Sequence, residues 1–276
     1  MSHPTEEELS LHEVAEILDV HYMTAYRYIR LGILPARREG RSWRIHRDDL
    51  DVYMTKGEPR TQRGEADWAD RFFNRVLAAD EAGAWGVVEA ALSSGMSVPD
   101  AYPTLLSPTM RRIGDLWSSG EIDVATEHAA SEVAARIVAR LGPRLARRGV
   151  RRGTVVLGST ATELHSLPLS MATDLFRAAQ FDAIDLGAYL PSDSFAAFVA
   201  ETDDVVAVGI GVTTPGQEDE LSETLRAIRD VTEVPIVIGG GGVDEAAALE
   251  LGADGWAQTG EEAVALVERL LSSTDA

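Results

Sequence analysis

The spacing of apolar side chains divides the chain into three segments with different periods. Residues 65–148 place apolar side chains three or four positions apart throughout, which predicts helices. Beyond residue 152, short β-branched runs alternate with helical stretches, whereas residues 1–58 combine short helices with two strand-like runs. We therefore predict three domains, residues 1–58, 65–148 and 152–274, with the polar stretch 56–64 as a linker.

The first segment has the outline of a winged helix-turn-helix domain. Ser10 and Glu13 form a capping-box pattern at the start of one helix, and a second helix is predicted over residues 22–31. Two strand-like runs within residues 36–46 predict a hairpin, and a last helix is expected over residues 47–54. The sequences of residues 11–18, 26–36 and 43–45 resemble those of excisionase- and MerR-type DNA-binding domains. The resemblance implies that the partner is a double-stranded DNA operator.

Two groups of side chains in this segment are candidates for DNA contact. The second helix suits a major-groove reader, and the arginines of the hairpin suit phosphate or minor-groove contact. The candidates are Tyr22, Thr24, Arg27 and Arg30 on the helix and Arg37, Arg38, Arg41 and Arg44 on the hairpin. Tyr26, Ile29 and Trp43 are assigned to the core. The alternative is a small protein-interaction module with solvated arginines.

The second segment predicts a four-helix bundle. Its helical pattern is interrupted at residues 80–83, 95–99 and 118–123, where polar residues and glycines gather. Four helices joined by such short breaks favour antiparallel packing.

The third segment predicts a parallel, doubly wound α/β domain of the flavodoxin-like or Rossmann-like type. Strands are expected at residues 154–158, 183–186, 205–212, 235–238 and 255–257, and helices at 167–180, 193–201, 217–230, 243–251 and 261–272. Ligands of such sheets bind beyond the carboxyl ends of the strands. The loops at residues 159–165, 211–216 and 239–242 are therefore the expected site.

Composition and charge narrow the function further. The 276 residues include 45 acidic and 25 basic side chains, for a net charge of −20, yet residues 27–63 hold 10 bases and 5 acids. A local basic patch on an acidic protein is compatible with DNA binding. The absence of cysteine excludes thiolate catalysis, cysteine-ligated zinc, iron–sulfur clusters and a thioether-attached chromophore. With no apolar run of about 20 residues and no signal-peptide pattern, a cytoplasmic protein is expected.

The loop after the first strand of the third segment offers the sharpest chemical signal. It lacks the G-x-G-x-x-G fingerprint of a nucleotide site, and no phospho-acceptor aspartate ends the third strand. It contains instead Glu163-Leu-His165. One histidine cannot hold a bare ion, but it can be the axial ligand when a macrocycle supplies four nitrogens, and Glu163 could hydrogen-bond its ring.

Residues 153–272 resemble cobalamin-binding domains, whose pattern is Asp-x-His-x-x-Gly, then Ser-x-Leu, then Gly-Gly. The resemblance implies that His165 is the lower cobalt ligand, and that the displaced nucleotide tail enters a groove beside Gly239 and Gly240. The chain departs from the pattern with Glu163 for Asp, Pro168 for Gly and no serine in residues 209–214. Thr213 or Thr214 then remains as a contact for the tail.

The helical segment resembles cobalamin-dependent photoreceptor regulators through a Trp-x9-Glu-His pattern. Its residues here are Trp117, Glu127 and His128, with Val124 on the same predicted helix face. The resemblance implies that the bundle covers the upper face of adenosylcobalamin. Trp117 would cap the adenosyl group, Glu127 would bind ribose hydroxyls or the purine edge, and His128 would bond a side amide. Related proteins have a histidine after the tryptophan, where this chain has Ser118, so His128 and water are both candidates for the upper ligand after illumination.

These resemblances imply a light-responsive transcriptional regulator rather than an enzyme. Light-driven cleavage of the cobalt–carbon bond would change the oligomeric state of a homo-oligomer, a dimer or a tetramer, and thereby DNA binding. A light-independent cobalamin-sensing DNA-binding regulator and a corrinoid methyl-carrier protein are the alternatives. A photoreceptor with an additional noncovalent bilin is a further variant.

Overall fold

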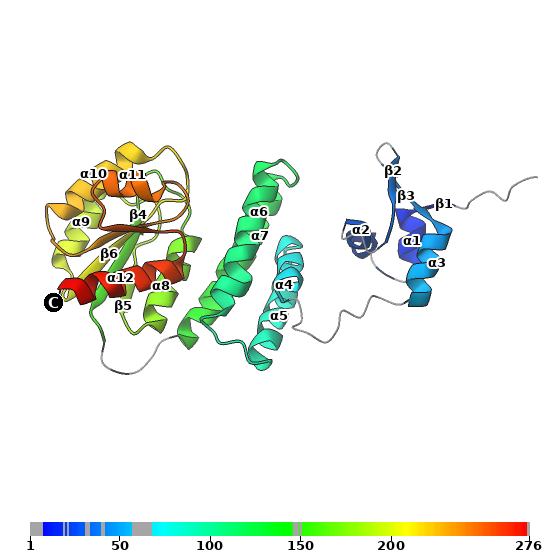
Figure 1. The fold of residues 1–276 in the computed structure, drawn as a ribbon, viewed down its shortest axis with the longest axis horizontal. Helices are drawn as coiled ribbons and strands as arrows, with labels where there is room; N and C mark the ends of the chain where they lie inside the picture. The colour runs from blue at the N-terminus through cyan, green and yellow to red at the C-terminus, as the bar shows by residue number, and fades with distance from the viewer. Residues whose placement is uncertain are drawn as a thin grey trace, which may run out of the picture. The chain divides into compact units, whose positions relative to one another are not determined.

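The computed structural model describes residues 8–18, 20, 22–30, 34–39, 42–56, 68–145, 149 and 151–274. The chain divides into two compact units, residues 1–66 and 67–276 (Figure 1). The predicted linker lies outside the described residues, apart from Lys56.

The first unit is a small α/β module with a three-stranded antiparallel sheet of order β1-β3-β2. Its elements are β1 (Glu8–Ser10), α1 (Leu11–Ile17), α2 (Tyr22–Arg30), β2 (Arg37–Glu39), β3 (Ser42–His46) and α3 (Arg47–Lys56). The predicted capping box is present, because the Ser10 side chain accepts a hydrogen bond from Glu13 N and Glu13 accepts one from Ser10 N. Strand β1 was not predicted from the sequence, because three residues are too few for a periodic signal.

The core of this unit agrees with the sequence assignment. Ile29 is buried, and Tyr26 and Trp43 are partly buried against the apolar cluster, with their rings 6.5 Å apart edge to face. Val14, Ala25, Leu34, Ile45 and Leu50 are fully buried in the same cluster. These contacts fix α2 against the sheet.

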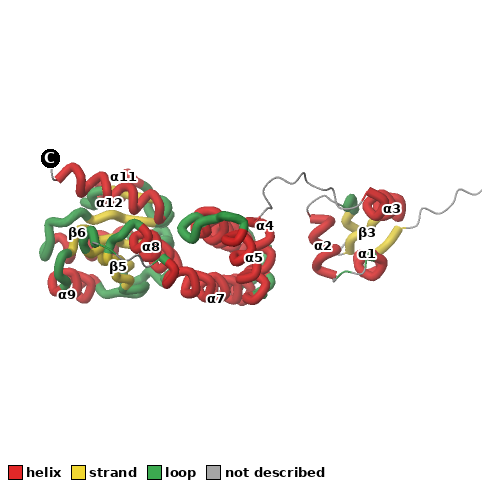
Figure 2. Tube along the Cα trace, turned by 90° about the horizontal axis from the view of Figure 1, so that it is seen from below, coloured by secondary structure: helices red, strands yellow, loops and turns green. Residues whose placement is uncertain are grey.

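Residues 68–145 form helices at the positions that the predicted breaks define. The helices are α4 (Trp68–Leu77), α5 (Glu81–Ser93), α6 (Ser107–Ser118) and α7 (Val124–Leu141), with a π-helical turn η1 (Tyr102–Leu106) before α6 and a 3-10 turn η2 (Gly142–Arg144) after α7. Side-chain caps start two of them, since Asp80 accepts from Gly83 N and Asp123 accepts from Thr126 N. The helices share one apolar core, and Figure 2 shows α4, α5 and α7 lying alongside one another.

Residues 154–274 form a five-stranded parallel sheet of order β5-β4-β6-β7-β8. This is the flavodoxin-like order of a doubly wound sheet, which decides between the two predicted types. The strands are β4 (Thr154–Ser159), β5 (Asp182–Asp185), β6 (Val205–Gly211), β7 (Ile236–Gly239) and β8 (Gly255–Ala257). The helices are α8 (Leu167–Ala178), α9 (Ser192–Glu201), α10 (Glu218–Arg229), α11 (Glu245–Glu250) and α12 (Gly260–Thr274).

The sheet is covered on both faces, as its nearly continuous apolar strands require. Helices α8 and α12 pack on one face, and α9, α10 and α11 pack on the other (Figure 1). Met171 and Leu175 of α8 also belong to the apolar core of the helices in residues 68–145. Helix α8 is thus shared by the two halves of this unit. No helix among the described residues is long and apolar enough to cross a membrane.

Candidate functional site

His165 lies in the loop between β4 and α8, at the carboxyl edge of the sheet. Its Nδ1 lies 2.6 Å from Oε1 of Glu163, so the two-residue contact expected from the sequence is present. The same carboxylate oxygen accepts a hydrogen bond from the backbone N of His165 at 2.9 Å. The carboxylate is buried, whereas 53% of the His165 side chain is exposed. Glu163 therefore fixes the ring through Nδ1 and leaves Nε2 available for an axial bond.

Glu163 also joins this loop to the loop after β6. Its other oxygen accepts hydrogen bonds from the backbone N of Thr213 at 2.6 Å and of Thr214 at 2.8 Å. Gln217, which the sequence did not single out, donates to the same oxygen and accepts from the hydroxyl of Thr160 at 2.6 Å. A carboxylate with a longer reach than aspartate thus holds two neighbouring loops together.

The electrostatics of the pair follow from these contacts. Burial by itself raises the pKa of Glu163, but hydrogen bonds from the His165 ring and from backbone N–H groups lower that pKa to about 2. The hydrogen bond with Glu163 raises the pKa of His165 against the opposing effect of burial, and the charge of Glu127 raises it further. Glu127 lies on α7, so a charge from the helical half of this unit acts on the histidine.

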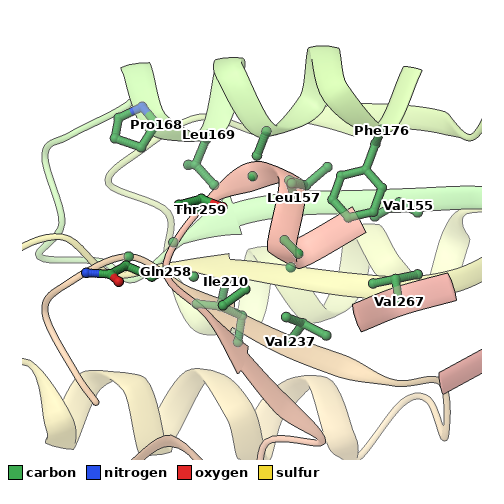
Figure 3. A pocket seen from close by; sticks show the side chains of 18 of the residues that line it. Val155, Leu157, Pro168, Leu169, Phe176, Ile210, Val237, Gln258, Thr259 and Val267 are labelled. Atoms are coloured by element: carbon green, nitrogen blue, oxygen red, sulfur yellow. The ribbon is translucent and has the colours of Figure 1, made fainter. Parts of the chain in front are cut away.

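A cavity runs from His165 beneath the sheet, between the sheet and helices α8 and α12 (Figure 3). Its volume is about 100 Å³, and most of the residues that line it are apolar. His165, Thr213, Gly239 and Gly240 line it, as predicted, together with Pro168. Thr214 is instead committed to Glu163, to which its N and hydroxyl both donate.

Gly240 has a steric reason to be glycine. Its φ is +108°, and a Cβ there would lie 2.3 Å from the carbonyl oxygen of Val212. The chain therefore passes close to the β6 loop at this point, which only glycine permits. Gly239 is different, because its Cβ would meet nothing nearer than 3.8 Å, so its small size leaves room in the cavity.

The helical residues predicted to contact a cofactor gather at the junction of α6 and α7. Trp117 at the end of α6 is 49% exposed, and Val124 at the start of α7 is 51% exposed. Glu127 accepts hydrogen bonds from the Ser131 hydroxyl and pairs with Nδ1 of His128. Although burial raises the pKa of Glu127, these bonds and the charge of His165 hold it below its ordinary value. Two large exposed apolar side chains beside a half-buried carboxylate are typical of a surface that a ligand covers.

Two further exposed side chains flank His165 and were missed in the sequence. Leu164 is 72% exposed and Tyr189, in the loop after β5, is 68% exposed. The backbone N of Tyr189 donates to the carbonyl of Glu163 at 2.8 Å, and its φ is +59°, which is uncommon outside glycine. Its position beyond the carboxyl end of a strand was the signal that could have identified it.

The three hairpin arginines that the structure describes lie on two faces of the hairpin. Arg37 pairs with Arg44 across β2 and β3, whereas Arg38 pairs with Trp43, so the arginines point to opposite faces of the hairpin. Glu8 of β1 accepts two hydrogen bonds from the Arg37 guanidinium, at 2.8 and 2.7 Å. Arg37 is therefore partly neutralised, which the sequence prediction did not foresee.

The other candidates of this unit are only partly described. Tyr22 is 37% exposed at the start of α2, its ring stacks on His12 at 4.5 Å, and Thr24 is partly buried in the same helix. The backbones of Arg27 and Arg30 are helical, but their side chains lie outside the description, and Arg41 lies outside the described residues altogether.

These residues fit a macrocycle better than a bare ion. Across the described parts of the chain, no three His, Cys, Asp or Glu side chains gather closely enough to hold a metal alone. The available donor set is one oriented histidine at the mouth of an apolar cavity. Such a set suits a cofactor that brings its own equatorial ligands and a tail.

Comparison with protein families defines the class. A helix-turn-helix domain matches residues 8–58, and B12 binding domains match residues 68–141 and 153–268. The protein is therefore of the class that joins a helix-turn-helix domain to cobalamin-binding domains.

Individual proteins of known type are similar to this chain over most or part of its length. A corrinoid protein of Desulfitobacterium hafniense is 26% identical over 208 residues, 73% of this chain and 96% of that protein. Dimethylamine corrinoid protein 3 of Methanosarcina mazei is 30% identical over 125 residues, 44% of this chain and 73% of that protein. The solved structure of the Methanosarcina barkeri monomethylamine corrinoid protein shares the fold, with a TM-score of 0.65, 21% identity, and coverage of 74% of this chain and 98% of that one. Outside the helix-turn-helix segment, the chain is thus similar in sequence to corrinoid proteins.

Proposed function

We propose that this protein is a cobalamin-dependent DNA-binding regulator that responds to light through adenosylcobalamin. The observation that carries the proposal is the half-exposed Trp117 at the end of α6, ten residues before Glu127 of α7, in a chain that also matches a helix-turn-helix domain. An upper face closed by a tryptophan suits a bulky upper group. A carrier that exchanges a small group with a partner enzyme needs that face open.

Different residues of the chain would bind different parts of the cofactor. His165 would bind cobalt from below, oriented by Glu163, and the tail would enter the cavity past Thr213, Gly239 and Gly240. When bound, adenosylcobalamin supplies a cobalt–carbon bond that visible light breaks.

On the upper side, Trp117 and Val124 would cover the adenosyl group, while Glu127 and His128 supply polar contacts to it and to the side amides. Contacts that the chain makes with only one state of the cofactor are what a switch requires.

In this function, residues 8–56 would act as a winged helix-turn-helix domain that binds DNA. Residues 68–145 would act as a four-helix bundle that covers the cofactor. Hairpin arginines such as Arg44 would contact phosphates. In a homo-oligomer, a dimer or a tetramer, several readers would bind one operator together, and separating them would lower the apparent affinity.

The methyl carrier is the second candidate function, because two of the three relatives named above are methylamine corrinoid proteins. The alignment with the Desulfitobacterium protein covers 96% of that protein but 73% of this chain, so the helix-turn-helix segment is an addition to the carrier architecture. A cofactor-level sensor without light response is the third form. In the proposal itself the protein is not an enzyme.

One experiment separates these candidates. The protein is loaded with adenosylcobalamin in darkness, and its absorption spectrum, elution volume and operator affinity are measured before and after green light. We expect a histidine-ligated spectrum that converts on illumination, with changes in oligomer size and DNA affinity. Binding that is identical in light and dark favours the cofactor sensor, and methyl transfer in vitro favours the carrier. A red absorption band in protein purified from cells would add a bilin.

A matched pair of histidine variants tests the cobalt ligand. His165→Ala is expected to remove the histidine-ligated spectrum of bound cobalamin and to lower affinity by about tenfold or more. His12→Ala, at an exposed position of the first unit, is the control and should leave both unchanged. A wild-type spectrum for the His165 variant would contradict the assignment.

A further inference from the structure

A π-helical turn lies directly before the helix that carries Trp117. The turn η1 runs into α6 without a break, and the backbone N of Ser107 donates to the carbonyl of Tyr102, five residues back. An α-helix closes this bond over four residues, so the turn holds one residue more, a feature that is frequent at functional sites. One residue corresponds to a rotation of about 100° and a rise of about 1.5 Å for the helix that follows.

Pro108 gives this turn a chemical cause. A proline is tolerated in the first turn of an isolated helix, but here η1 places it inside a continuous helical run. In a regular α-helix its ring would clash with the carbonyl of Thr104, and it has no N–H to donate to that oxygen. Because the wider turn relieves the clash, Pro108 favours the π-helical form over the α-helical form.

The hydroxyl of Thr109 lacks the bond that an α-helix would give it. Thr109 is 2% exposed, and its Oγ1 has no hydrogen-bond partner among the described residues. Thr173 of α8 and Thr224 of α10 are also buried, and each donates to the carbonyl four residues back, at 2.8 Å. For Thr109 the corresponding acceptor is the carbonyl of Leu105, which lies inside the π-helical turn. The unpaired hydroxyl therefore coincides with the extra residue.

The two ends of this helical run are held to different degrees. Tyr102 is fully buried, and its hydroxyl donates to Asp174 of α8 at 2.7 Å. Trp117, at the other end, is 49% exposed. A change in the turn therefore acts on the orientation of Trp117 rather than on that of Tyr102.

We propose that Pro108 is a positioning residue for Trp117, because it holds the π-helical turn open and thereby sets the rotation of α6. The inference rests on the proposed function, in which Trp117 covers the adenosyl group. Pro108→Ala restores an N–H and removes the clash, so the turn can close into an α-helix. Trp117 would then lie at a different angle to the fixed end of the run.

A double-mutant cycle tests whether Pro108 holds the turn open. Urea unfolding midpoints are measured for the protein without cofactor. Thr109→Val should raise the midpoint or leave it unchanged in the wild-type background, since it removes an unpaired buried hydroxyl. In the Pro108→Ala background the same substitution should lower the midpoint, because the hydroxyl has gained the carbonyl of Leu105. Thr173→Val is the control: it removes a bond present in both backgrounds and should lower both midpoints equally.

Cofactor binding tests whether the turn positions Trp117. In darkness, the dissociation constant of adenosylcobalamin, measured by absorbance titration, should be at least about threefold higher for Pro108→Ala than for wild type, because an aromatic contact is misplaced. Hydroxocobalamin, which has no adenosyl group, should bind as it does to wild type, with the histidine-ligated spectrum retained. Pro143→Ala, in the exposed turn η2 after α7, is the control and should change neither affinity.

The possible outcomes separate the parts of the proposal. Equal effects of Thr109→Val in the two backgrounds overturn the claim that Pro108 holds the turn open. An equal loss of affinity for both cobalamins overturns the positioning of Trp117.

Two further outcomes are covered by the same measurements. If Pro108→Ala does not fold, Thr109→Val and Thr173→Val are compared in the wild-type background, where equal losses would mean that Thr109 has a partner and would overturn the proposal. Failure of both cobalamins to bind wild type overturns the proposed function and the role of Trp117. The unfolding cycle reports on the turn alone, so the two failures are distinguished.

Discussion

The hydroxyl of Tyr102 donates a hydrogen bond to Oδ2 of Asp174 at 2.7 Å, and neither residue is more than 4% exposed. Tyr102 begins the π-helical turn η1, and Asp174 lies on α8, the helix that begins directly after the His165 loop. Burial raises the pKa of both groups, and the hydrogen bond to Asp174 raises that of Tyr102 further. Gly142 packs directly against this pair, because a Cβ there would lie 2.8 Å from the Asp174 carboxylate. We call the contact of Tyr102, Asp174 and Gly142 the joint. This contact ties the helix beside the histidine loop to the helical core.

Removing the Tyr102 hydroxyl tests the strength of this joint. Tyr102→Phe leaves a buried carboxylate short of one donor and should lower the free energy of unfolding by about 1–3 kcal/mol. The measurement is urea unfolding of the protein without cofactor. Tyr189→Phe, in which the exposed ring keeps its place, is the control and should change stability by less than about 0.5 kcal/mol. Equal stability of the two variants would show that the joint contributes nothing.

Glu163 predicts a pH dependence of stability. Its folded pKa of about 2 lies below the usual 4.5, so its contribution is fully present above pH 4.5 and is lost as the pH falls toward 2. Glu163→Gln cannot accept all the hydrogen bonds that the carboxylate accepts, and should be roughly 1–3 kcal/mol less stable at neutral pH.

The check is urea unfolding of wild type and Glu163→Gln between pH 7 and pH 3. The stability difference between them should shrink as the pH falls below about 4.5. Glu89→Gln, at an exposed position of α5, serves as the control and should keep a difference from wild type below about 0.5 kcal/mol throughout. If the difference in the free energy of unfolding between wild type and Glu163→Gln does not change with pH, the charge of Glu163 does not stabilise the loops.

The sheet and its helices could be predicted because their signals are local. Each strand of the third segment is a short apolar run, and the structure places β4 to β8 within a few residues of the predicted ranges. The helix breaks at Asp80 and Asp123 are likewise local, since each side chain caps the helix that follows it.

Other features depend on contacts that sequence spacing does not encode. Gln217 joins the Glu163 network across more than 50 residues of sequence, and no periodicity marks it. Strand β1 and the pairing of Glu8 with Arg37 are also long-range, so no local pattern in the sequence could predict them. The predicted loops after β4 and β6 did meet, because carboxyl ends of parallel strands share an edge.

Trp117 predicts selectivity for the upper group of the cofactor. Its ring is half exposed, so truncation to Ala removes little packing from the helical core. Trp117→Ala should weaken dark binding of adenosylcobalamin by about tenfold, because a stacked aromatic contact and the area it covers are lost. Hydroxocobalamin has no adenosyl group, and its affinity should change by less than about threefold. Equal losses for the two cobalamins, measured by absorbance titration, would place Trp117 outside the upper contact.

Because Glu8 pairs with Arg37 beside Arg44, we expect substitutions of Glu8 and of Arg44 to change operator affinity in opposite directions. Arg37 and Arg44 are opposite each other in the hairpin, and the hydrogen bonds from Arg37 lower the pKa of Glu8, so the carboxylate stays charged beside them. Arg44→Ala should weaken operator binding and reduce the slope of log affinity against log salt by about 1. Glu8→Gln removes a negative charge from the same face and should strengthen binding and steepen that slope. The measurement is fluorescence anisotropy over a salt series, with Arg269→Ala, on the exposed side of α12, as the control. A structural role for the ion pair would make Glu8→Gln weaken binding too, so opposite effects of the two substitutions are the result that assigns this face to DNA.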